Sequence, residues 1–121
     1  MANEISITIA GTLTNGNLRR RNEPGTKQVT QTAQGQHGGT VALTTAITQL
    51  TVGSVTTYGW AFYQNVSGSG VIYLGPHSTT LVPTVELRAG EVAAFRIIAG
   101  TTMAARTVSG GANLLQEIWQ D

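Results

Sequence analysis

Short runs in which apolar and polar residues alternate dominate this chain. Near the N-terminus, Ile5, Ile7 and Ile9 alternate with small polar residues, which is typical of a strand with one buried face. Comparable runs follow, and glycine, asparagine, proline or serine residues separate each run from the next. This pattern predicts strands over residues 5–9, 27–32, 40–47, 58–66, 71–74, 84–87, 91–98, 103–108 and 114–119.

The clearest signal lies in the middle of the chain. An aromatic and β-branched run over residues 58–66 and a short apolar run over 71–74 flank a turn of glycine and serine, so we predict a β-hairpin here. Tyr58, Trp60 and Phe62 are spaced two residues apart and share one face of the strand, which favours burial in the core. The alternative is an exposed aromatic surface that stacks on sugar rings.

The frequency of threonine and the spacing of glycine argue against long helices, although residues 44–50 and 114–120 contain short helix-compatible runs. About eight short strands at intervals of roughly 8 to 12 residues indicate an all-β fold. We predict a single-domain antiparallel β-sandwich over residues 1–121, jelly-roll-like rather than a closed barrel. Residues 15–25 and 34–39 fit this pattern poorly and are predicted to be extended loops or arms.

The amino-acid composition is ordinary for the core but unusual for the surface. A chain of 121 residues and 12.7 kDa is the size of one domain. Hydrophobic residues make up 40%, which is ordinary, whereas charged residues make up only 11%, against about 25% in a typical soluble domain. Nineteen threonines and 15 glycines take the place of the charges. The predicted surface is therefore polar and nearly neutral.

Charge and apolar content exclude several classes of partner. A net charge of +1 offers no broad basic face, which argues against nucleic acid as a partner. The N-terminus lacks the basic and apolar segments of a signal peptide. The most apolar stretch, residues 92–99, is short and contains Arg96, so no membrane span is expected. These features predict a soluble product that is made in the cytoplasm.

The sequence offers little support for a metal, a cofactor or a catalytic set. Because there is no cysteine, disulfides and thiolate metal sites are excluded. His37 and His77 have no second ligand residue within four positions. Glu86 and Glu91 flank a turn and resemble the paired carboxylates of glycoside hydrolases, but Arg88 lies between them and favours surface ion pairs. We expect no enzyme activity and no cofactor.

One charged run stands out in a chain with few charges. Arg19, Arg20 and Arg21 are adjacent, and they fall in a segment that the strand pattern does not explain. Such runs are often only solvated, but an arginine-rich loop can also clasp an acidic partner surface. We take these three arginines, together with Lys27 and His37, as the candidate partner-contact residues.

Three parts of the chain resemble small virion proteins of tailed bacteriophages. They are the opening segment through Ile9, the central aromatic region with its Gly75-Pro76 step, and the turn that contains Arg88 and Glu91. The resemblance covers roughly residues 3–9 and 52–106 and is diffuse, since it includes no metal or nucleotide motif.

The resemblance implies a structural role in the phage particle. The expected function is that of a non-enzymatic capsid decoration or cement protein, which binds the major capsid protein and stabilises the shell of the virion. Self-association is also expected, and a trimer would suit quasi-threefold positions of a capsid. The alternative is a tail or fibre module that binds a receptor or glycan through the aromatic strand.

Overall fold

The computed structural model describes residues 5–31, 35–53, 55 and 58–120. The chain forms two compact units, residues 1–32 and residues 33–121. Strands and the turns between them account for all of the regular structure in the described residues, so the predicted all-β class is confirmed. No helix in these ranges is long and apolar enough to cross a membrane.

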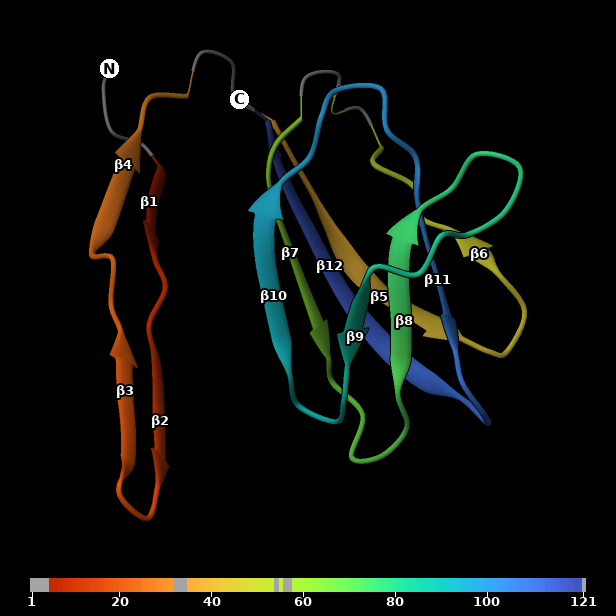
Figure 1. Cartoon of the computed structure of the whole chain (residues 1–121). Coiled ribbons are helices and arrows are strands. Elements are labelled where there is room, and N and C mark those ends of the chain that lie inside the picture. Colours follow the sequence, from red (N-terminus) through yellow and green to blue (C-terminus); the bar gives the residue numbers. More distant parts are fainter. Residues whose placement is uncertain (1–4, 32–34, 54, 56–57, 121) are drawn as a thin grey trace. The chain divides into compact units, whose positions relative to one another are not determined.

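The first unit is a long two-stranded antiparallel ribbon (Figure 1). Strand β1 (Ile5–Thr8) pairs with β4 (Thr26–Val29), and further along β2 (Gly11–Asn15) pairs with β3 (Leu18–Asn22). The two strands β2 and β3 join at the ribbon tip through a two-residue turn, where Gly16 has a φ of 56° that few other residues adopt. We call residues 5–29 the N-terminal ribbon.

The second unit is a β-sandwich of two four-stranded sheets (Figure 1). One sheet has the order β10-β7-β12-β5 and the other β6-β11-β8-β9, and all pairs are antiparallel. This unit has eight strands, and with the four of the ribbon the described residues form twelve, more than the roughly eight predicted for the whole chain. The bounds of the eight are β5 (Gln36–Leu43), β6 (Thr48–Gln49), β7 (Tyr58–Asn65), β8 (Ile72–Pro76), β9 (Val85–Leu87), β10 (Val92–Arg96), β11 (Met103–Thr107) and β12 (Ala112–Gln120).

Two segments that the pattern predicts as irregular are strands instead. Residues 18–22 form β3 of the ribbon, and residues 36–39 begin the long strand β5. Apart from Leu18, neither segment contains a large apolar residue, so alternation does not reveal them as strands. Their strand conformation depends on the backbone hydrogen bonds of a partner strand, β2 in one case and β12 in the other.

The core of the sandwich lies between the two sheets and is aliphatic with one large aromatic side chain. Buried residues alternate with more exposed ones along β12 from Ala112 to Trp119 and along β8 from Ile72 to Leu74. Tyr63 enters this core from β7, where it stacks on Phe95 of β10 with ring centroids 5.7 Å apart. The fully buried aliphatic members of the cluster include Ile72, Leu74, Leu114 and Ile118.

The predicted hairpin in the middle of the chain is wrong. Strand β7 belongs to one sheet and β8 to the other, so the connection over residues 66–71 crosses from sheet to sheet. The same is true of the turn between β9 and β10. Glycine-rich turns serve both kinds of connection, because they supply a tight reversal without specifying which strand pairs with which.

The predicted burial of the aromatic strand face is also wrong. In β7 the fully buried positions are Gly59, Ala61, Tyr63 and Asn65, whereas Trp60 and Phe62 lie on the outer face and are half-buried. Because aromatic side chains occur on both faces of this strand, its residue types do not reveal which set of alternate positions points into the core. On the inner face, Ala61 and its partner Ile118 in the adjacent strand are both fully buried.

Tyr63 gives a testable dependence of stability on pH. Its hydroxyl is buried and has no hydrogen-bond partner among the described residues. Burial, and secondarily the neighbouring Tyr58, raises the pKa of Tyr63 far above its ordinary value of 10.0. The unfolded chain therefore loses this proton near pH 10 while the folded chain keeps it, so stability falls as the pH rises through that range.

We expect Tyr63→Phe to remove this dependence. The variant should be as stable as the parent protein at pH 7, or more stable by up to about 1 kcal/mol, because an unpaired hydroxyl leaves the core. Between about pH 9 and 11 its unfolding free energy should fall less steeply than that of the parent. Urea unfolding at several pH values tests this, and Tyr73→Phe on the outer face of the other sheet is the control. Parallel pH curves for Tyr63→Phe and the parent would contradict the prediction.

Candidate functional site

The three adjacent arginines lie in β3, the strand that follows the turn at the tip of the ribbon. Arg19–Arg21 belong to β3 and stand opposite residues 12–14 of β2. Every residue of β2 and β3 is exposed, so side chains on both faces of this part of the ribbon are open to solvent. Since neighbouring residues of a strand point to opposite faces, Arg20 lies on one face and its two neighbours lie on the other.

Only one of these arginines has an ion-pair partner among the described residues. The guanidinium of Arg21 lies 3.0 Å from a carboxylate oxygen of Glu23 and also donates a hydrogen bond of 3.1 Å to the second oxygen. Both side chains are well exposed, so this pair adds little stability. Arg19 and Arg20 remain as the two cations that a partner surface could engage.

Two exposed leucines accompany Arg20. Leu13 stands directly opposite Arg20 and is 48% exposed, and Leu18, which is 52% exposed, shares the same face of β3. The pattern of charges alone does not reveal them. A signal was present in the sequence, because Gly16-Asn17 between two short runs is one of the dipeptides that favour a two-residue hairpin turn. We define the ribbon tip as Leu13, Leu18, Arg19 and Arg20.

The remaining candidate contact residues do not join the tip. Lys27 lies in β4 of the ribbon, opposite Ile7, and is exposed. His37 belongs to β5 of the sandwich, where it is half-buried opposite Ile118. Its ring packs against Gly53, since a Cβ atom at that glycine would lie 2.6 Å from Nδ1 of His37. The environment of His37 therefore favours a packing role.

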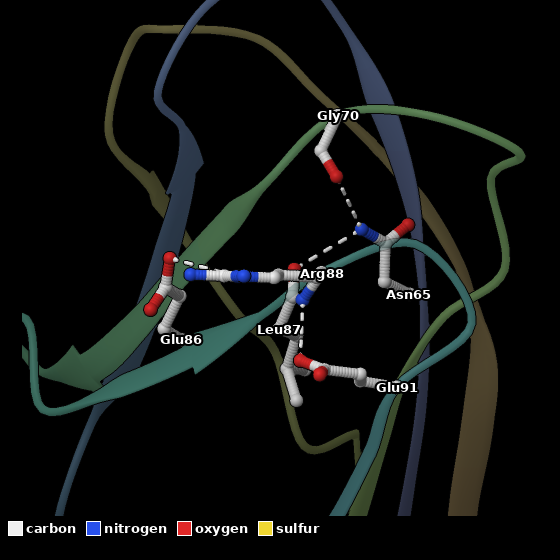
Figure 2. Close-up of polar contacts among 6 residues, drawn as sticks. All are labelled: Asn65, Gly70, Glu86, Leu87, Arg88 and Glu91. Atoms are coloured by element: carbon white, nitrogen blue, oxygen red, sulfur yellow. Dashed lines mark hydrogen bonds and ion pairs between the residues drawn. The ribbon is translucent and has the colours of Figure 1, made fainter.

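The two carboxylates considered for hydrolysis are each engaged in local structure (Figure 2). Oε1 of Glu86 lies 3.6 Å from Nε of Arg88, and Oε2 of Glu91 accepts a hydrogen bond of 2.8 Å from the backbone N–H of Arg88. Glu91 thereby closes the turn between β9 and β10. These contacts favour the ion-pair interpretation of the cluster over a pair of catalytic carboxylates.

A buried asparagine near this turn was not recognised from the sequence. Asn65 is fully buried, and its Nδ2 donates hydrogen bonds of 3.1 Å to the carbonyl oxygens of Gly70 and Leu87 (Figure 2). Its Oδ1 accepts a bond of 3.1 Å from the N–H of Ser67. Asn65 thus ties the loop after β7 to the end of β9, which makes it a structural residue.

No cluster of three or more histidine, cysteine, aspartate or glutamate side chains suited to a metal ion occurs in the residues that the structure describes. The polar features that stand out are therefore the ribbon tip and the outer face of the aromatic strand.

Comparison with known proteins shows a similarity of fold. No family model matches the chain, and no curated protein matches it. A solved structure from Bacillus endospore appendages, which form a family of disulfide-linked pili, is similar with a TM-score of 0.51 and 14% sequence identity. The match covers 74% of this chain and 88% of the appendage protein. At this identity the likeness concerns the fold alone.

Proposed function

We propose that this protein is a non-enzymatic structural subunit that attaches to a phage capsid through its N-terminal ribbon and stabilises the shell. The observation that carries the proposal is the separate ribbon, whose tip exposes leucine and arginine side chains together. A two-stranded hairpin is marginally stable by itself in water, so a surface that covers the tip would also order it.

The chemistry of the tip defines the surface it would bind. Arg19 and Arg20 point to opposite faces of β3, and each guanidinium can form paired hydrogen bonds with a carboxylate. The exposed Leu13 and Leu18 add apolar area on the face of Arg20. An acidic surface with a shallow apolar patch, formed by the major capsid protein, fits these features.

The composition of the whole chain supports a fixed position in an assembly. A freely diffusing protein usually carries more charge for solubility than the 11% found here. The appendage protein with a similar fold belongs to a disulfide-linked pilus, but this chain contains no cysteine. Contacts with the capsid or with further copies of the chain would therefore not include disulfides.

Co-sedimentation with phage capsids that lack their decoration protein tests the proposal. The full-length protein should pellet with these capsids at micromolar concentration. The double variant Arg19→Glu/Arg20→Glu should bind at least about tenfold more weakly, because two charge-assisted contacts become repulsive. Arg88→Glu, which changes an exposed arginine of the sandwich, is the control and should bind as the parent does. Failure of the parent protein to pellet, or equal binding of the ribbon variant, would contradict the proposal.

A further inference from the structure

The outer face of the sheet β10-β7-β12-β5 carries a pair of aromatic side chains that lie outside the core. Phe62 of β7 and Trp119 of β12 lie side by side there, with ring centroids 4.5 Å apart and an angle of 52° between the rings. Both are half-buried. Large aromatic side chains on the solvent side of a sheet are a recurrent feature of ligand surfaces.

The pairing of β12 with β7 is irregular beside this tryptophan. Strands β12 and β7 pair regularly up to Ile118, which stands opposite Ala61, but Gln120 then stands opposite Tyr58. Trp119 lies at this irregularity. Two residues of β7, Gly59 and Trp60, stand there against Trp119 alone, so the extra residue of the bulge lies in β7. Bulges of this kind bend the strand that carries the extra residue, and they are frequent beside binding sites.

A polar network adjoins the aromatic pair. Glu117 stands opposite Phe62 in the register, and its Oε1 accepts hydrogen bonds from Nε1 of Trp119 at 2.8 Å and from Nε2 of Gln36 at 3.5 Å. The short bond from Trp119 orients the carboxylate and the indole toward each other, whereas the contact from Gln36 is at the outer limit of hydrogen-bond length. No described residue donates to the second carboxylate oxygen, Oε2, which leaves an acceptor beside the two rings.

The charge on this face indicates the class of ligand. Glu117 contributes one negative charge, and Arg96 of β10 contributes one positive charge while its guanidinium lies 5.7 Å from the centre of the Trp60 ring. Among the described residues on the outer face of these four strands, Arg96 is the only cation, so the described part of the face has no cluster of positive charge that would attract a polyanion. Two tilted rings beside a preorganised carboxylate and an amide suit a ligand with one apolar face and several hydroxyl groups.

We propose that this face binds a neutral saccharide, with a hexose ring against Trp119 and Phe62 and its hydroxyls hydrogen-bonded to Glu117 and Gln36. The inference goes beyond the assembly role and depends only on the sandwich unit.

Isothermal titration of the full-length protein with neutral hexose oligomers tests this inference. Maltohexaose, cellohexaose and mannohexaose are the probes, and a hyaluronan hexasaccharide represents acidic glycans. We expect at least one neutral oligomer to bind with a Kd between micromolar and millimolar values and the acidic one to bind no better. Trp119→Ala should weaken binding by at least about tenfold, as loss of a central aromatic contact does.

Two further variants separate binding from folding. Glu117→Gln changes one atom of the network and should also weaken binding, whereas Tyr73→Ala should not. Tyr73 is the matched control because it is half-buried on the outer face of the other sheet, where Arg106 lies 5.3 Å from its ring centre. The inference is overturned if no neutral oligomer binds, if only the acidic one binds, or if Trp119→Ala binds as the parent does. It is equally overturned if light scattering shows a dimer that Trp119→Ala dissociates, since the face would then contact a second copy.

Discussion

Replacing Asn65 with alanine is expected to lower the free energy of unfolding of the sandwich by about 2 to 4 kcal/mol. The side chain is fully buried, and its amide forms three hydrogen bonds to the backbone of two connections. Alanine would leave the carbonyls of Gly70 and Leu87 and the N–H of Ser67 without this partner. Each buried polar group that loses its partner costs about 1 to 3 kcal/mol, and water entering the partly buried bonds reduces the total.

Urea unfolding followed by tryptophan fluorescence measures this loss of stability in the sandwich unit. Both tryptophans of the chain, Trp60 and Trp119, belong to the sandwich, so the signal does not report on the ribbon. Asn113→Ala is the control, because that asparagine is exposed on β12 and should change the free energy by less than about 0.5 kcal/mol. An Asn65→Ala variant as stable as the control would show that the three bonds do not hold the loops.

Replacing Gly75 with alanine is expected to be at least as damaging, for a steric reason. Gly75 is buried in β8, and the segment that follows the strand folds back over it, with the N–H of Thr84 bonded to the carbonyl of Leu74 at 3.0 Å. A Cβ atom at Gly75 would overlap the carbonyl oxygen of Val82 and lie 3.1 Å from the backbone nitrogen of Thr84. Because backbone atoms cannot rotate away as a side chain can, we expect a loss of about 3 kcal/mol or more.

The matched control for this variant is Gly68→Ala. Gly68 has an ordinary φ, and a Cβ atom there would meet no atom within 4 Å. The same fluorescence-detected unfolding should therefore show a midpoint close to that of the parent protein for Gly68→Ala and a much lower one for Gly75→Ala. Equal midpoints for the two variants would mean that the segment over Gly75 can move aside at little cost.

The two proposals concern different units of the molecule and can fail independently. The ribbon tip is proposed to bind through charge and exposed leucines, whereas the aromatic face of the sandwich is proposed to bind through ring stacking and hydrogen bonds. A capsid-binding defect in the arginine variant with intact saccharide binding, and the converse for Trp119→Ala, would separate the two activities.

The candidate site could be predicted only in part. The arginine run is visible in the sequence, because three adjacent charges stand out in a chain with 11% charged residues. Their strand conformation was not visible, since β3 is exposed on both faces and has no alternation. Leu13 and Leu18 join the arginines only once β2 and β3 are paired in register. The Phe62 and Trp119 pair likewise depends on two strands that are more than fifty residues apart in the sequence.

By itself, the sequence determined the all-β class and the position of most strands of the sandwich, including β7, β10, β11 and β12. These features are local, because a strand with one buried face must alternate and glycine-rich segments must turn. The tertiary structure alone decided which sheet each strand joins and which face of β7 points inward. Those choices depend on packing between residues distant in the chain: Ala61 and Tyr63 fill the space between the sheets, and Trp60 and Phe62 are left on the outside.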